Sequence, residues 1–140
     1  MFKSNISFAE EQLLSYLPKT GKFYEVNRNY SEDRSNNKTT SLLSPFIRYR
    51  LISEEEVLKK TLEIHELRDC EKFVQEIYWR TYWKGWLEHR STVYSDYLED
   101  RNKLIDEFGN KRFYLNAVSG NSNLLFFNNW VKTLKEDGYL

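Results

Sequence analysis

The chain has 140 residues, of which 40% are hydrophobic and 16% aromatic, and a chain of this length normally forms one domain. Lysine and arginine number 21 together, as do aspartate and glutamate, so no overall positive charge favours nucleic-acid binding. The single cysteine, Cys70, excludes an internal disulfide framework, and the sequence has neither an apolar membrane-spanning run nor a signal core. We therefore expect a cytoplasmic protein that does not associate with a membrane.

The N-terminal part of the chain predicts one helix followed by a loop. Residues 5–17 have Asn5 as a candidate cap and apolar side chains at helical spacing. Pro18 and Gly21 predict the end of this helix. Residues 20–38 are polar and carry charges of both signs, which is typical of a long surface loop.

Two helix starts are predicted in the next part of the chain. Residues 41–50 predict a short helix with a hydroxyl cap and Pro45 in its first turn. Ser53 is followed by three glutamates, and a serine cap with acids in the first turn is typical of a helix N-terminus. The apolar side of this second helix is formed by Val57, Leu58, Thr61, Leu62 and Ile64.

Residues 69–96 give the strongest helical pattern, and they include three of the four tryptophans. Because this helix is apolar on most sides, we expect it to be central and buried. Residues 98–112 are highly charged and predict a solvated helix end and loop. A turn is expected around residues 119–123 and a last helix over 124–136. No segment shows β alternation, so the predicted fold is all-α.

Few residues have the spacing of a catalytic or metal site. His65 and His89 lie 24 residues apart without a cysteine or carboxylate cluster, and a lone helical histidine is more often structural. Cys70 is interpreted as a small buried hydrophobe. We therefore predict no metal ligand and no catalytic residue in this chain.

Two groups of residues suggest a ligand. The first comprises Tyr30 and Arg34 with the hydroxyl-rich stretch Thr40, Ser41, Leu42, Leu43 and Ser44. Hydroxyls and amides at a helix start favour an anion, although plain helix capping explains the same pattern. The second group is Glu76, Trp79, Arg80 and Trp83 on one helical face, which suits a planar ligand. An aromatic core with a Glu76–Arg80 pair is the alternative.

The same two segments resemble the flavin-binding helical domain of the DNA photolyase/cryptochrome family. TTSLLSPFIRYRLISEEEV is similar to the family's threonine-serine-x-leucine-serine-proline segment and the following helix. FVQEIYWRTYWKGWLEHR is similar to its second signature, and residues 120–140 resemble its glycine-rich turn and next helix. The resemblance covers residues 30–140, so residues 1–29 are expected to be an N-terminal helix and linker.

The resemblance implies FAD as cofactor and damaged DNA as substrate in light-driven repair of pyrimidine dimers. The FAD-binding positions would be Tyr30, Arg34, Thr40, Ser41, Leu42, Ser44, Phe73 and Arg80. Glu76 and Trp79 would contact a flipped dimer by hydrogen bonding and stacking. Phe73 stands where most members have tryptophan, Leu42 where arginine is common, and Asn128 where aspartate is usual.

The matched part is only the first half of the family's domain, which implies that this chain alone is inactive. Exposed apolar patches would then be expected, with a second copy or a complementing chain covering them. The alternative hypothesis is a small helical protein-interaction module that has lost cofactor binding.

Overall fold

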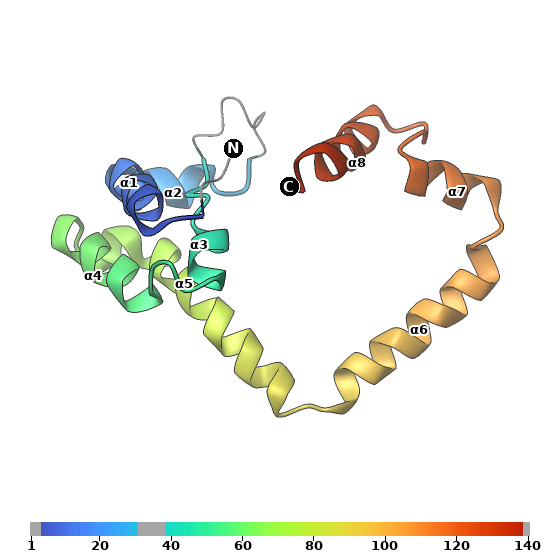
Figure 1. Ribbon diagram of the computed structural model, residues 1–140, viewed down its shortest axis with the longest axis horizontal. Coiled ribbons are helices and arrows are strands. Elements are labelled where there is room, and N and C mark those ends of the chain that lie inside the picture. The colour runs from blue at the N-terminus through green and yellow to red at the C-terminus, as the bar shows by residue number, and fades with distance from the viewer. Residues whose placement is uncertain (1–3, 31–38, 139–140) are drawn as a thin grey trace. The chain divides into compact units, whose positions relative to one another are not determined.

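The structure is a computed structural model that describes residues 4–30 and 39–138 (Figure 1). Helices are the only regular elements in these two ranges, so the all-α prediction is confirmed. Their order is α1 (Ile6–Tyr16), the 3-10 helix η1 (Leu17–Lys19), α2 (Lys22–Asn27), α3 (Ser44–Arg48), α4 (Glu54–Ile64), α5 (Leu67–Glu88), α6 (Thr92–Phe108), α7 (Arg112–Ser119) and α8 (Leu125–Asp137).

The chain divides into two compact units, a first unit over Met1–Trp86 and a second unit over Leu87–Leu140. The division expected from the sequence, at residue 30, stays a prediction.

Local capping chemistry begins α1 and α4 as predicted. The Asn5 side chain accepts a hydrogen bond of 2.8 Å from the Phe8 amide, and the Ser53 hydroxyl accepts one of 3.0 Å from the Glu56 amide. Each cap satisfies an amide that has no partner within its own helix.

The chain between residues 20 and 30 differs from the prediction of a loop, because Lys22–Asn27 form α2. This helix begins after Gly21, where an added Cβ atom would lie 3.0 Å from the His65 ring. Glycine therefore allows the start of α2 to approach the end of α4. Residues 31–38 of the predicted loop lie outside the described part of the chain.

One hydrophobic core holds the first unit together. The short helix η1 contacts α1, α2 and α4, and α3 and α5 add apolar side chains to the same cluster. The buried members are Ala9, Leu13, Tyr16, Leu17, Leu43, Phe46, Ile47, Ile52, Val57 and Phe73. On the predicted apolar side of α4, Val57 and Thr61 are buried, whereas Leu62 and Ile64 are exposed.

The prediction of one central, buried helix over 69–96 is wrong in two respects. The helix α5 ends at Glu88 and a separate helix, α6, begins at Thr92. Only Cys70 and Phe73 are buried in α5, and its later aromatic rings contact one another along the helix. A high aromatic content therefore did not mean burial here.

The second unit is built from α6, α7 and α8, and none of the residues described in them is buried. Much of the predicted charged stretch 98–112 is helical, and α7 was not predicted. The turn between α7 and α8 is confirmed, with Gly120 at φ 82°. The Asn128 side chain closes this turn through hydrogen bonds to Ser122, accepting from its amide and hydroxyl and donating to its carbonyl.

Candidate functional site

Residues 39–44, which we call the hydroxyl segment, are tied to helix α1. The Tyr16 hydroxyl donates a buried hydrogen bond of 2.6 Å to the Thr39 carbonyl. The Gln12 side-chain amide donates one of 3.2 Å to the Ser41 carbonyl. The backbone of the segment is thus fixed by two side chains that lie one helical turn apart.

Tyr30 is linked to the hydroxyl segment through its backbone carbonyl. The Thr39 hydroxyl donates a hydrogen bond of 3.2 Å to the Tyr30 carbonyl. Tyr30 itself is 67% exposed, so its side chain is accessible. Arg34, the other predicted phosphate contact, lies outside the described residues.

The prediction that a hydroxyl caps α3 is wrong. The N-cap is Leu43, whose side chain makes no capping bond, and Pro45 occupies the first turn as expected. Instead the Ser41 hydroxyl accepts a long bond of 3.4 Å from the Leu43 amide. Leu42 has φ 55°, a left-handed conformation that costs a non-glycine residue about 1–2 kcal/mol. The segment therefore bends sharply just before α3, and Ser44 is exposed after the bend.

Phe73, which the resemblance assigns to the cofactor site, is a core residue that is 2% exposed. Its ring lies 6.3 Å from that of Tyr16 and 5.1 Å from that of Tyr24, edge-on to the latter. Phe73 thus supports Tyr16, whose hydroxyl holds the hydroxyl segment.

Glu76 forms an ion pair with Arg28, which immediately follows α2. Both side chains are partly exposed, so the pair contributes little to stability by itself. Burial, and then the Glu76 charge, raise the pKa of the neighbouring Tyr24. The pair draws the end of α2 to α5 and gives one oxygen of Glu76 a fixed partner.

Trp79 is 44% exposed and stacks on Trp83, with ring centroids 5.6 Å apart and planes inclined by 19°. Tyr82 contacts both rings edge-on, and Trp86 contacts Trp83. We call Trp79, Tyr82, Trp83 and Trp86 the aromatic ladder of α5. Its rings offer flat apolar surface together with mutual support.

Arg80 pairs with Glu54 at the start of α4, with 3.6 Å between Nε and Oε1. The other oxygen of Glu54 accepts a bond of 2.6 Å from Arg50. Glu76 and Arg80 therefore each pair with a residue outside α5, which replaces the alternative of a Glu76–Arg80 pair within the helix.

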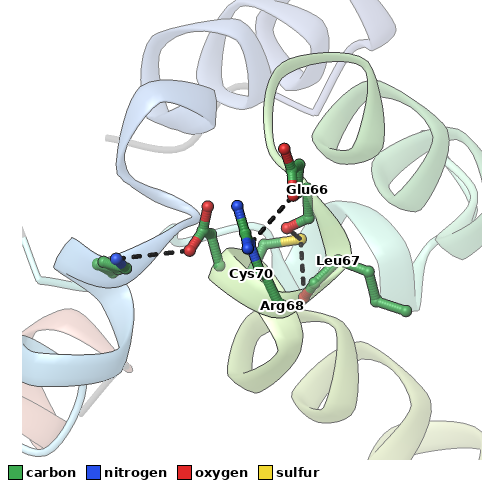
Figure 2. A network of polar contacts seen from close by, with 6 residues as sticks. Glu66, Leu67, Arg68 and Cys70 are labelled. Atoms are coloured by element: carbon green, nitrogen blue, oxygen red, sulfur yellow. Dashed lines mark hydrogen bonds and ion pairs between the residues drawn. The ribbon is translucent and has the colours of Figure 1, made fainter.

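Cys70 and His65 have structural surroundings. The Cys70 thiol is buried and points at the carbonyls of Glu66, which precedes α5, and of Leu67 in the first turn of α5, at 3.5 and 3.8 Å (Figure 2). Burial raises the pKa of this thiol, which disfavours the reactive thiolate. The His65 ring is 3.0 Å from the Leu17 carbonyl oxygen. Cys70 is thus buried as predicted, and the His65 ring contacts the backbone of η1.

Sequence reasoning missed Gln12, Tyr16 and Arg28 as residues that organise the site. A tyrosine among the apolar residues of an amphipathic helix was the available signal, because a buried phenol requires a hydrogen-bond partner. Arg28 gave no such signal, since its partner lies 48 residues away.

The described residues contain no cluster of three or more histidine, cysteine or acidic side chains suited to a metal. None of the helices in this part of the chain has the length and apolar character needed to cross a bilayer. Comparisons with protein-family models, with curated proteins and with solved structures found no match to this chain.

Proposed function

We propose that the hydroxyl segment, together with Tyr30 and Arg34, binds the phosphates of FAD in a helical domain of the DNA photolyase/cryptochrome type. The observation that carries this proposal is the hydrogen bond between the Thr39 hydroxyl and the Tyr30 carbonyl. It brings together the two sequence stretches that the resemblance assigns to one phosphate site. The left-handed turn at Leu42 within the same stretch also supports a functional role, because such strain concentrates at binding sites.

The donors of this site would be side chains rather than a helix dipole. The helix α3 has five residues, so few aligned peptide units add to its dipole. Ser41, Ser44 and Tyr30 supply hydroxyls, and Arg34 supplies charge. A hydrogen bond to a charged acceptor contributes about 1.5–3 kcal/mol. Two or three such bonds are enough to make phosphate contacts the main source of affinity.

The DNA side of the proposal places a damaged pyrimidine pair against Glu76 and Trp79. The Glu76 carboxylate has two oxygens, and the one that does not bind Arg28 can accept a hydrogen bond from a base. Trp79 has 44% of its surface exposed and can stack on a base taken out of the duplex. The flavin, when bound, would supply the light-driven electron transfer, and this chain's residues would hold the reactants.

The test is a titration of FAD with the purified full chain, followed by the change in flavin fluorescence. The double variant Ser41→Ala/Ser44→Ala removes two proposed donors and is expected to weaken FAD binding at least tenfold. Ser95→Ala is the matched control, because its exposed hydroxyl bonds only to the Thr92 carbonyl of its own helix among the described contacts. Equal affinities for all three proteins would contradict the phosphate site.

Exposed apolar surface favours a second candidate function, that of a protein-interaction module. Trp79 and Trp83 of the aromatic ladder are 44% and 48% exposed, and in α8 Phe126 and Trp130 are 62% and 50% exposed. Each unit thus carries an exposed pair of contacting aromatic rings, and exposed apolar clusters of this kind are typical of interaction sites. Sedimentation equilibrium over a range of concentrations tests self-association. A discrete dimer that binds no FAD would favour this function over the first.

A further inference from the structure

Two polar side chains of α1 face the backbone of the hydroxyl segment. Gln12 and Tyr16 are four residues apart and therefore lie on the same side of the helix. Their donors reach carbonyl oxygens two residues apart, those of Ser41 at 3.2 Å and Thr39 at 2.6 Å. One face of α1 thus binds the carbonyls of two residues of the segment, Thr39 and Ser41.

The partial negative charge of a carbonyl oxygen makes these two hydrogen bonds relevant to phosphate binding. A carbonyl oxygen is a hydrogen-bond acceptor with partial negative charge, so it repels a phosphate oxygen. A segment that binds phosphate must keep its carbonyls turned away while its hydroxyls donate. Because side chains of α1 bind the Thr39 and Ser41 carbonyls, the helix sets the orientation of both peptide groups.

The core fixes the positions of these two donors. Tyr16 is 4% exposed, its ring packs near that of Phe73, and Leu13 and Leu17 of the same cluster anchor the flanking turns. Burial of the Tyr16 phenol raises its pKa, which keeps the hydroxyl protonated and able to donate. Gln12 is half-buried at the edge of this core.

We infer that Gln12 and Tyr16 are positioning residues for the phosphate site, which orient the hydroxyl segment by binding the Ser41 and Thr39 carbonyls. This inference rests on the proposed FAD site and assigns a role to α1, which lies outside the stretch that resembles the photolyase family. Neither side chain touches the ligand, and both act through the backbone of the segment.

The test compares Gln12→Met and Tyr16→Phe, which keep side-chain size and remove the donor, with two controls in the full chain. Thr61→Val removes another buried hydroxyl-to-carbonyl bond, of 2.8 Å within α4. Gln75→Met removes a side-chain amide donor on α5. Dissociation constants for FAD and for ADP are measured at a temperature where all five proteins give the same far-UV circular dichroism.

We expect the dissociation constants for both FAD and ADP to rise at least fivefold in Gln12→Met and Tyr16→Phe. ADP is included because it carries the diphosphate without the flavin. The two controls are expected to change these constants less than twofold, even if Thr61→Val lowers the melting temperature as much as Tyr16→Phe does.

The outcomes separate the two claims. If the wild-type chain binds neither FAD nor ADP, the proposed function is wrong and the role of α1 falls with it. If the wild type binds and the two α1 variants bind equally well, only the positioning role is overturned. A loss for FAD without a matching loss for ADP would also overturn it, because the effect would then not act through the phosphates.

Discussion

Replacing Phe73 by alanine tests the packing that supports the candidate site. Phe73 is 2% exposed and its ring contacts those of Tyr16 and Tyr24. Truncating a buried phenylalanine usually costs about 3–5 kcal/mol, which combines lost transfer free energy with a residual cavity. The two ring contacts add about 0.5–1.5 kcal/mol each beyond burial. We therefore expect a loss at the upper end, near 4–5 kcal/mol.

Urea unfolding followed by far-UV circular dichroism measures this loss. Tyr78→Ala is the matched control, since Tyr78 is on the same helix and 60% exposed, and it should cost less than about 1 kcal/mol. Phe73→Trp, which introduces the residue usual in the family that the sequence resembles, should overpack the core and cost about 1–3 kcal/mol. A Phe73→Ala loss no larger than that of Tyr78→Ala would refute the core position of Phe73.

Three further predictions concern the turn of the second unit and the pH dependence of the first. Gly120→Ala should lower the stability of the α7–α8 turn by about 1–2 kcal/mol, measured by amide hydrogen exchange, because φ is 82° and the new Cβ would lie 3.1 Å from Val131. Asn128→Asp should cost about 1–3 kcal/mol by the same assay, because the Ser122 carbonyl loses its donor; unchanged exchange would contradict that role. Burial raises the pKa of Tyr16 above its ordinary value of 10.0, so the unfolded state loses its proton first and stability falls as pH rises above about 10. Tyr16→Phe should show a shallower fall in urea unfolding between pH 9 and 11, and identical slopes would count against the buried phenol.

Local chemistry made part of this fold predictable from the sequence. Asn5 and Ser53 each cap a helix by accepting a hydrogen bond from the amide three residues further along the chain. Such a contact depends only on neighbouring residues, so the sequence alone predicts it. The turn at Gly120 was also predictable from local sequence, since glycine readily adopts the left-handed conformation found there.

Tertiary contacts account for what the sequence did not predict. The short helix α2 has no strong apolar period; it begins where Gly21 closely approaches His65, and it is followed by Arg28, which pairs with Glu76. In α5, apolar residues on most sides predicted burial, but the rings of Trp79 and Trp83 stack on each other and remain partly exposed.

In the candidate site, too, local features were predictable from the sequence and tertiary contacts were not. The hydroxyl-rich composition of residues 40–44 was visible in the sequence, as was the common face of Glu76 and Trp79. The hydrogen bonds from Gln12 and Tyr16 span 29 and 23 residues, and such pairings do not follow from spacing. The phosphate role of these hydroxyls stays a prediction.

The most direct test of the central claim is the visible absorption spectrum of the purified chain after incubation with FAD and gel filtration. Retained bands at about 370 and 450 nm, where flavins absorb, are the predicted result, and they should be lost in the Ser41→Ala/Ser44→Ala variant. A colourless wild-type protein that keeps its helical circular dichroism would contradict the claim that the hydroxyl segment holds FAD.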